Sequence, residues 1–266
     1  DECHHLGAEV FQKSMAKVAS KYSLGLSATP KRKDGLTKVF EWFIGPIVYS
    51  QKVKNEDYAE VQLIPFISDD LQYSKVEINF RKEPNMPKMI NNICNFFPRT
   101  QLIIDLIQKY NKEGRIILIL SNRREHLNTL YEKLSGFSRG FYVGGMKPNE
   151  LRDSQTKDIL LATFSMASEG MDIPSLDTVI LASPKSDVEQ SVGRIFRKKA
   201  CDRKFHPLII DIQDEFSMFT NQCKKRLTFY KKMNFTIFKD GEEIPKSKRG
   251  RRKKDVAVPD FALINE

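Results

Sequence analysis

The sequence predicts an α/β fold that is built on a parallel, doubly wound sheet. Short, continuous apolar runs of the kind that is buried on both faces of a parallel sheet recur in the second half of the chain, most clearly in Arg115–Leu120. Segments whose apolar residues have helical spacing alternate with these runs, as in Thr100–Tyr110. This alternation favours parallel strands joined by helical crossovers. Ligands of such sheets bind outside the carboxyl ends of the strands, where polar residues follow several runs here.

A chain of 266 residues can form one large domain or two modest ones, each with its own core. No apolar run approaches the length that crosses a membrane, so we expect a soluble chain. The cysteines are scattered, which supports neither a zinc site nor a disulfide framework and favours a reducing, intracellular compartment. They are Cys3, Cys94, Cys201 and Cys223.

The formal net charge of +10 suggests a polyanionic partner. Seven basic residues, however, lie within Lys246–Lys254, so the rest of the chain is only mildly basic. Charged residues and proline dominate after about Gly241, and we expect residues 241–266 to form a disordered, basic tail.

Residues 1–51 indicate the end of a first α/β lobe. Residues 9–20 have the apolar spacing of a helix, and residues 22–27 are expected to form a short strand. A charged loop that begins at Pro30 ends this strand. Residues 36–49 then predict a second short helix, followed by a turn and a strand.

Residues 52–98 are the least regular part of the chain, and we interpret them as a connector with a small pair of strands. Alternating apolar residues predict one strand near Val61–Ile67 and another near Val76–Phe80. The segment Met89–Phe97 is apolar enough to be a helix that packs on the next lobe.

Residues 99–240 predict a complete second lobe in which strands and helices alternate. The expected strands are residues 115–120, 141–143, 159–162, 178–181 and 208–212. The expected helices are residues 100–110, 125–134 and 216–230.

One stretch of this lobe, Ile159–Arg197, combines two of the strands with a Ser/Gly-containing loop and a helix. Residues three and four apart lie on one face of a helix, and the four that do so here are Gln190, Gly193, Arg194 and Arg197. Planar guanidinium groups on such a face can stabilise the charge of a phosphoryl group in transfer. The alternative interpretation is a solvated basic face, because Lys198 and Lys199 follow directly.

Two segments of this stretch resemble motifs V and VI of superfamily 2 helicases and translocases, namely SEGMDIP at residues 168–174 and QSVGRIFR at residues 190–197. The first four residues, Asp1-Glu2-Cys3-His4, resemble motif II, the DEAD/DEAH-type Walker B box, and Ser27-Ala28-Thr29 resembles motif III. Within the superfamily, the sequence is most similar to the XPB-like (Ssl2-like) DNA translocases, including versions encoded by large DNA viruses. The supporting segments are GLSATPKRKDG (25–35), FIGPIVY (43–49) and QSVGRIFRKK (190–199).

The resemblance implies two stacked RecA-like lobes with ATP between them. This chain would supply one complete C-terminal lobe and the tail end of the first, ATP-binding lobe. The P-loop pattern G-x-x-x-x-G-K-[ST] has no match in the sequence. We therefore expect a C-terminal fragment of a longer ATP-hydrolysing enzyme, inactive alone, whose N-terminal lobe is a partner.

The resemblance also implies roles for individual residues. Asp1 would hold the Mg²⁺ of an ATP complex through water, and Glu2 would position or deprotonate the attacking water. Arg194 and Arg197 would be a pair of arginine fingers. The expected ATP-binding residues are Gly170, Asp172 and Gln190. The residues expected to couple hydrolysis to movement are His4, Ser27 and Thr29. The residues expected to contact the nucleic-acid backbone are Ser121, Arg123, Thr163 and Ser165.

The function predicted in this way is that of the C-terminal part of an ATP-dependent helicase or double-stranded-DNA translocase, with ATP and Mg²⁺ as cofactors. The expected partners are nucleic acid, chiefly double-stranded DNA, and transcription or repair machinery, in a nucleus, a virus factory or a virion. The alternative is a non-catalytic nucleic-acid-binding module from a split or truncated helicase gene, with the basic tail as its main contact.

Overall fold

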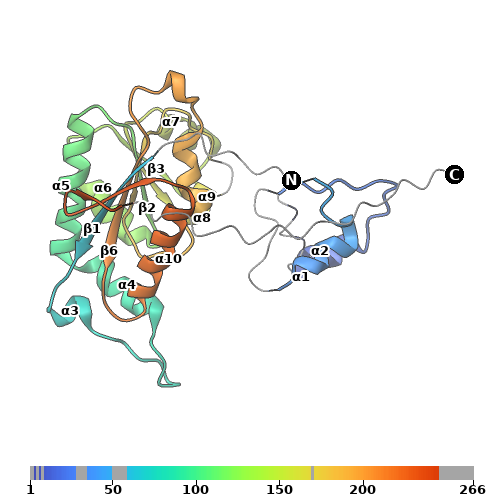
Figure 1. The fold of residues 1–266 in the computed structure, drawn as a ribbon, viewed down its shortest axis with the longest axis horizontal. Helices are drawn as coiled ribbons and strands as arrows, with labels where there is room; N and C mark the ends of the chain where they lie inside the picture. The colour runs from blue at the N-terminus through green and yellow to red at the C-terminus, as the bar shows by residue number, and fades with distance from the viewer. Residues whose placement is uncertain are drawn as a thin grey trace. The chain divides into compact units, whose positions relative to one another are not determined.

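The computed structural model describes Cys3, Leu6 and residues 9–27, 35–49, 59–168 and 171–245 (Figure 1). The chain divides into two units, Asp1–Lys54 and Asn55–Glu266, which we describe separately. Several residues to which the sequence assigns roles lie outside the described residues, namely Asp1, Glu2, His4, Thr29 and Gly170. The basic stretch Lys246–Lys254 lies outside them as well.

The first unit contains two short helices, α1 (Glu9–Met15) and α2 (Thr37–Ile44), where the sequence predicts helices. α2 ends at Gly45, which has a φ of 113° and whose N–H donates to the Glu41 carbonyl over 2.8 Å. Residues 22–27 and 46–49 do not form strands, so the two strands predicted there are wrong. A strand needs a neighbouring strand to satisfy its backbone groups, and the described residues of this unit provide none.

The second unit is built on an eight-stranded sheet with the strand order β3-β4-β2-β5-β6-β1-β7-β8. Every pairing is parallel except that of β7 with β8, which confirms the predicted parallel α/β fold. The strands are β1 (Glu60–Phe66), β2 (Ile117–Ser121), β3 (Arg139–Tyr142), β4 (Ile159–Thr163), β5 (Thr178–Leu181), β6 (Leu208–Asp214), β7 (Thr236–Lys239) and β8 (Glu242–Glu243).

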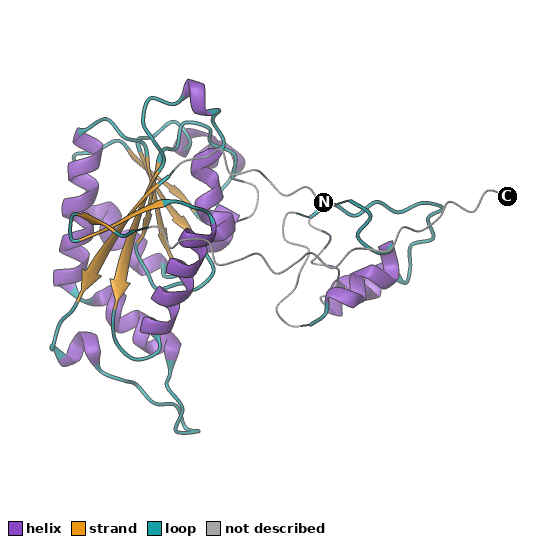
Figure 2. Ribbon diagram, viewed as in Figure 1, coloured by secondary structure: helices purple, strands orange, loops and turns teal. Residues whose placement is uncertain are grey.

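Helices cover both faces of this sheet, as Figure 2 shows. Alternate residues of a strand face opposite sides. Ile117 and Ile119 of β2 therefore pack with α5 and α6, whereas Leu118 and Leu120 pack with α8, α9 and α10. The helices are α3 (Leu71–Ser74), α4 (Met86–Asn95), α5 (Phe97–Lys112), α6 (Arg124–Lys133), α7 (Pro148–Ser154), α8 (Phe164–Ser168), α9 (Glu189–Val192) and α10 (Phe219–Lys232). Within the described residues, no helix is long and apolar enough to cross a membrane.

The segment expected to be a connector is part of the second unit over its described residues. β1 lies between β6 and β7, with Glu60 in register with Leu208 on one side and Thr236 on the other. The alternation of Val61 and Leu63 predicts this strand correctly, but its partners lie far away along the chain and no local pattern reveals them. The second strand predicted here is reduced to one antiparallel bridge between Ile78 and Pro84.

The start of the expected disordered tail also belongs to the sheet. Asp240 and Gly241 both have positive φ, at 53° and 84°, and they connect β7 to β8 as a two-residue hairpin turn. Lys239 and Glu242 are in register on either side of the turn. An Asp-Gly pair in the sequence favours such a turn. Because β8 pairs with β7, the start of the segment expected to be a tail belongs to the lobe, whose described residues extend to residue 245.

Candidate functional site

The carboxyl ends of the central strands lie along one edge of the sheet. Ser121 at the end of β2 is in register with Thr163 at the end of β4, and Leu120 is in register with Leu181 of β5. The segments that leave these three strands are therefore neighbours. They include most of the described residues that the sequence predicts to be functional.

Thr163 and Ser165 lie where β4 gives way to α8. The Thr163 hydroxyl accepts from the Met166 N–H over 3.5 Å, as an N-cap residue does, and its oxygen is 3.2 Å from the Ser165 hydroxyl. Thr163 is half-buried and Ser165 is exposed. Both hydroxyls thus lie close together at the carboxyl edge of the sheet.

Arg194 joins α8 and the residues after it to the segment that follows α9. Its guanidinium donates to the carbonyl of Ala167 over 2.6 Å, to that of Met171 over 2.9 Å, and to that of Ser168. A planar guanidinium has five donors in a fixed fork, so it can hold three carbonyls at once. A second link joins the hydroxyls of Ser168 and Ser191, which are 3.2 Å apart. The two segments with motif resemblance are therefore bound to each other.

Arg197 lies in a different environment. Its side chain is 48% exposed, and its Nε is 3.8 Å from a carboxylate oxygen of Asp172, which is 73% exposed. Water screens an ion pair of this length and exposure, so it contributes little to stability. The two arginines thus have different environments, because Arg194 donates to backbone carbonyls whereas Arg197 is exposed to solvent.

The helix predicted for residues 190–197 is only partly an α-helix. α9 ends at Val192, and Gly193–Phe196 continue as a 3₁₀ turn. Side chains three residues apart align in a 3₁₀ helix, which keeps Arg194 and Arg197 on the same side. A Cβ added at Gly193 would meet nothing within 4 Å, so the surface beside it is open. Gln190 is half-buried at the start of this segment.

Ser121 has a structural role, which corrects the prediction that it contacts nucleic acid. It is fully buried, its hydroxyl accepts from the Arg123 N–H over 3.1 Å, and its oxygen is 3.2 Å from His126 Nδ1. The sequence places a hydroxyl at the strand end correctly, but it cannot show that the turn into α6 covers it.

Arg123 connects the turn after β2 to α4. Its guanidinium donates to the Pro87 carbonyl over 2.9 Å and to the amide oxygen of Asn91. Asn122 in the same turn donates from its backbone to the Ser183 hydroxyl over 2.8 Å, in the loop after β5. This turn is therefore the junction between α4, β2 and the loop that leads to α9.

The buried imidazole of His126 predicts a pH dependence of stability. Burial, assisted by the positive charge of Arg99, lowers the pKa of His126 from 6.5 to about 3. The unfolded chain takes up this proton near pH 6.5 whereas the folded chain does not. Stability is therefore unaffected above that pH and falls as the pH drops towards 3. At pH 5 the loss is about 2 kcal/mol.

Urea unfolding at pH 7 and pH 5 measures this effect. His126→Asn should remove about 2 kcal/mol from the difference between the two pH values, whatever it does to stability at pH 7. An equal pH difference in both proteins would show that His126 titrates normally in the fold.

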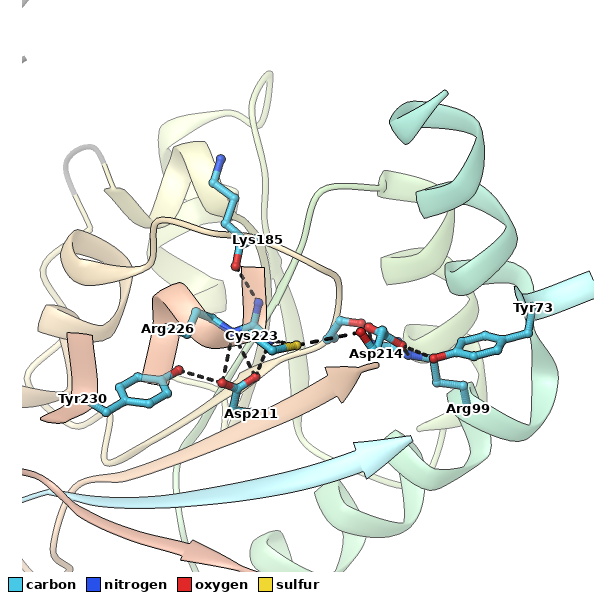
Figure 3. A network of polar contacts seen from close by, with 9 residues as sticks. Tyr73, Arg99, Lys185, Asp211, Asp214, Cys223, Arg226 and Tyr230 are labelled. Carbon is cyan, nitrogen blue, oxygen red and sulfur yellow. Dashed lines mark hydrogen bonds and ion pairs between the residues drawn. The ribbon is translucent and has the colours of Figure 1, made fainter. Parts of the chain in front are cut away.

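Two buried ion pairs lie on β6, and Figure 3 shows them together. The spacing of apolar residues does not reveal them. Arg99 of α5 donates to Asp214 over 2.7 and 2.9 Å, and Arg226 of α10 donates to Asp211 over 2.8 to 3.0 Å. The hydroxyls of Tyr73 and Tyr230 donate to the same carboxylates, over 2.8 and 3.0 Å respectively. The signal in the sequence is the pair of aspartates in the apolar run LIIDIQD, because a buried charge needs a partner.

Both arginines also hold the loop between β5 and α9. Arg99 donates to the Ala182 carbonyl and Arg226 to the Lys185 carbonyl, each over 2.7 Å. These bonds come from helices on opposite faces of the sheet. They fix the start of the loop that leads to Arg194 and Arg197. The buried ion pairs therefore stabilise the position of the segment that carries these two arginines.

The known proteins to which this chain is similar include helicases. Residues 98–199 match the family model of the helicase conserved C-terminal domain. The chain is 38% identical over 247 residues to a protein of Acanthamoeba polyphaga mimivirus that is named as an ATP-dependent RNA helicase, and the match covers 90% of this chain and 47% of that protein. The chain spans about half the length of the curated relatives it matches.

Two solved structures share the fold. The crystal structure of phage T4 UvsW matches with a TM-score of 0.55 and 18% identity, over 77% of this chain and 45% of that one. The structure of S. cerevisiae Dbp5 bound to RNA and ADP BeF3 matches with a TM-score of 0.55 and 13% identity, over 90% of this chain and 58% of that one. The second unit therefore has the fold of a RecA-like lobe. Residues 98–199 of this lobe are similar to the helicase conserved C-terminal domain.

Proposed function

We propose that this chain is the C-terminal part of an ATP-dependent helicase or translocase that moves along nucleic acid, with double-stranded DNA as its preferred track. The observation that carries the proposal is the contrast between Arg194 and Arg197. An arginine that stabilises a phosphoryl group in transfer must be open to the nucleotide and fixed in position. Arg197 is open, and the bonds of Arg194 fix the segment that bears it.

The described residues of this lobe fit a nucleotide phosphate. The weak ion pair of Arg197 with Asp172 can give way to a charged phosphate oxygen, which binds a guanidinium more strongly. We assign Asp172 and Gln190, with Gly170, to the ribose and phosphates. Asp1 would hold Mg²⁺ through water and Glu2 would orient the attacking water, while His4, Ser27 and Thr29 would couple hydrolysis to movement.

The nucleic acid would contact the hydroxyls of Thr163 and Ser165 at the carboxyl edge. Hydroxyls bind the phosphates of the backbone, which carry no sequence information, so we expect little sequence specificity. The preference for double-stranded DNA follows from the resemblance to the XPB-like group, together with a role in transcription or repair in a nucleus, a virus factory or a virion. The mimivirus relative is named as an RNA helicase, so RNA is the alternative nucleic acid along which the enzyme would move.

Displacement of the third strand from a DNA triplex tests the proposal in the complete gene product. This assay reports movement along double-stranded DNA without requiring the strands of the duplex to separate. We expect displacement with ATP and none with ADP. Separation of RNA duplexes without triplex displacement would change the track to RNA, and the absence of both activities would overturn the proposal.

The basic stretch Lys246–Lys254 favours a second candidate function, that of a non-catalytic nucleic-acid-binding module. Deleting residues 246–266, which leaves β8 intact, should flatten the dependence of DNA binding on salt concentration, because each neutralised phosphate releases about one counterion. Binding titrations of the chain with and without these residues, over a series of salt concentrations, measure the slope. An unchanged slope would place the contacts in the folded lobe.

A further inference from the structure

An exposed hairpin lies between α3 and α4, and we call its residues, 75–85, the arm. In Figure 1 the arm extends away from the sheet, between α3 and the start of α4. The side chain at its tip, Phe80, is 91% exposed. Leaving so large an apolar side chain in water forgoes about 2 kcal/mol of burial free energy, so its exposure needs an explanation.

Hydrogen bonds within the arm give it a defined shape. The Asn79 side-chain oxygen accepts from the N–H groups of Arg81 and Glu83, over 2.8 and 3.0 Å. The Asn79 N–H donates to the Glu83 carbonyl over 2.8 Å, and Lys82 adopts a φ of 59° in the turn. Phe80 is thus held outward by a closed turn.

A second set of contacts closes the base of the arm. The Asn85 N–H donates to the Glu77 carbonyl over 2.7 Å. The Glu77 carboxylate is 2.8 Å from the Lys88 ammonium group at the start of α4. The hydrogen bond from Lys88 lowers the pKa of Glu77, which keeps this pair charged.

The tip carries an aromatic ring beside two positive charges. The Arg81 guanidinium lies 5.3 Å from the centre of the Phe80 ring, and Lys82 follows. Proteins bind single-stranded nucleic acid with this combination, because every base can stack on a ring while cations contact the phosphates on either side.

A groove runs beside the base of the arm, with a volume of about 560 Å³. Its lining includes three side-chain amides, one ammonium group and one carboxylate, namely those of Gln72, Asn92, Asn95, Lys75 and Glu77. The Glu77 carboxylate lies 3.5 Å from the Lys75 ammonium group and accepts from the Asn92 amide over 3.4 Å. Amides can both donate to and accept from the edges of a base, so the groove has the chemistry to hold a nucleotide next to the one on the tip.

The arm is attached to the edge of the sheet where the nucleic acid is proposed to run. Arg123, in the turn after β2, donates to Pro87 and Asn91 at the start of α4, directly after the arm. This turn leaves the end of β2, whose last residue is in register with Thr163. The arm, the groove and the hydroxyls of Thr163 and Ser165 thus emerge from one edge.

We propose that the arm binds an unpaired nucleotide, such as one at the end or junction of a duplex. The base stacks on Phe80, Arg81 and Lys82 contact the flanking phosphates, and the groove receives the neighbouring nucleotide. This inference rests on the proposed function, in that nucleic acid is the track of the enzyme.

Binding of a single-stranded oligodeoxynucleotide that carries one 2-aminopurine tests the inference on the full chain. Stacking on an aromatic ring quenches 2-aminopurine fluorescence. We expect quenching with the unaltered chain and with Phe80→Trp, which keeps a ring. Phe80→Ala should lose the quenching and bind roughly 5- to 150-fold more weakly. This exposed position imposes no packing demand, so the variant should fold.

Phe97→Ala is the matched control. Phe97 is also exposed, at 57%, and has Lys133 at 5.9 Å from its ring, but it lies outside the arm at the start of α5. Its loss should leave affinity and quenching unchanged. Equal affinity and quenching of the unaltered chain and Phe80→Ala would overturn the inference, as expected if Phe80 serves a protein partner. Absence of oligonucleotide binding would overturn it too. The triplex assay on the complete gene product tests the proposed function separately.

Discussion

Arg197→Lys in the complete gene product is expected to reduce ATP turnover by about three orders of magnitude, while the affinity for ATP changes little. Lysine keeps the positive charge but loses the planar fork that matches phosphate oxygens. The exposed position of Arg197 means that the substitution disturbs no buried contact. Single-turnover hydrolysis and nucleotide-binding titrations measure the two quantities.

Lys198→Ala is the matched control for Arg197, because it removes an exposed positive charge one residue further on. It should leave turnover nearly intact. Equal, mild effects of both substitutions would mean that this segment is only a solvated basic surface, which is the alternative that the sequence leaves open.

Arg194→Lys should also reduce turnover, but for a different reason. One ammonium group cannot hold the carbonyls of Ala167, Ser168 and Met171 together, so the segment that bears Arg197 loosens. The free energy of unfolding should fall as well, and this separates Arg194 from Arg197. A reduction in turnover at unchanged stability would instead place Arg194 in contact with the nucleotide.

Arg226→Met is expected to lower the free energy of unfolding by about 3–5 kcal/mol. The substitution leaves the fully buried carboxylate of Asp211 without its guanidinium and removes the bond to the Lys185 carbonyl. Tyr230 remains as a donor to Asp211, but a single neutral hydroxyl cannot replace a charged partner. Urea unfolding followed by circular dichroism measures the change.

Lys225→Met controls for the loss of charge on α10, since Lys225 is exposed one residue earlier. Its effect should be within about 0.5 kcal/mol. Asp211→Leu combined with Arg226→Met should recover much of the lost stability, because an apolar pair needs no hydrogen bonds. A loss below 1 kcal/mol for Arg226→Met alone would show that the pair is solvated or loosely formed.

Apolar runs in the sequence correctly predict several strands of the sheet, but they do not show which strands pair with each other. The apolar runs of β2, β4 and β5 are each short and continuous, the run of β6 is interrupted by Asp211, and each forms a strand of the parallel sheet. The partners of β1 are absent from any local pattern because they lie more than a hundred residues away. In the first unit, the strands predicted at residues 22–27 and 46–49 find no partner among the described residues.

In the candidate site, the sequence likewise indicates where side chains lie along the chain, but not which of them are buried or what they contact. Spacing predicts that Arg194 and Arg197 share a face, but it cannot show that backbone carbonyls engage one of them while the other is exposed. A hydroxyl at a strand end is a fair candidate for a phosphate contact, yet Ser121 is covered and Ser165 is exposed. Burial, which decides such cases, is a property of the whole fold.

ATP hydrolysis by the complete gene product, with and without nucleic acid, tests the central claim most directly. The account predicts turnover that rises on addition of double-stranded DNA and that Arg197→Lys abolishes. Equal turnover with and without double-stranded DNA, single-stranded DNA and RNA would contradict it.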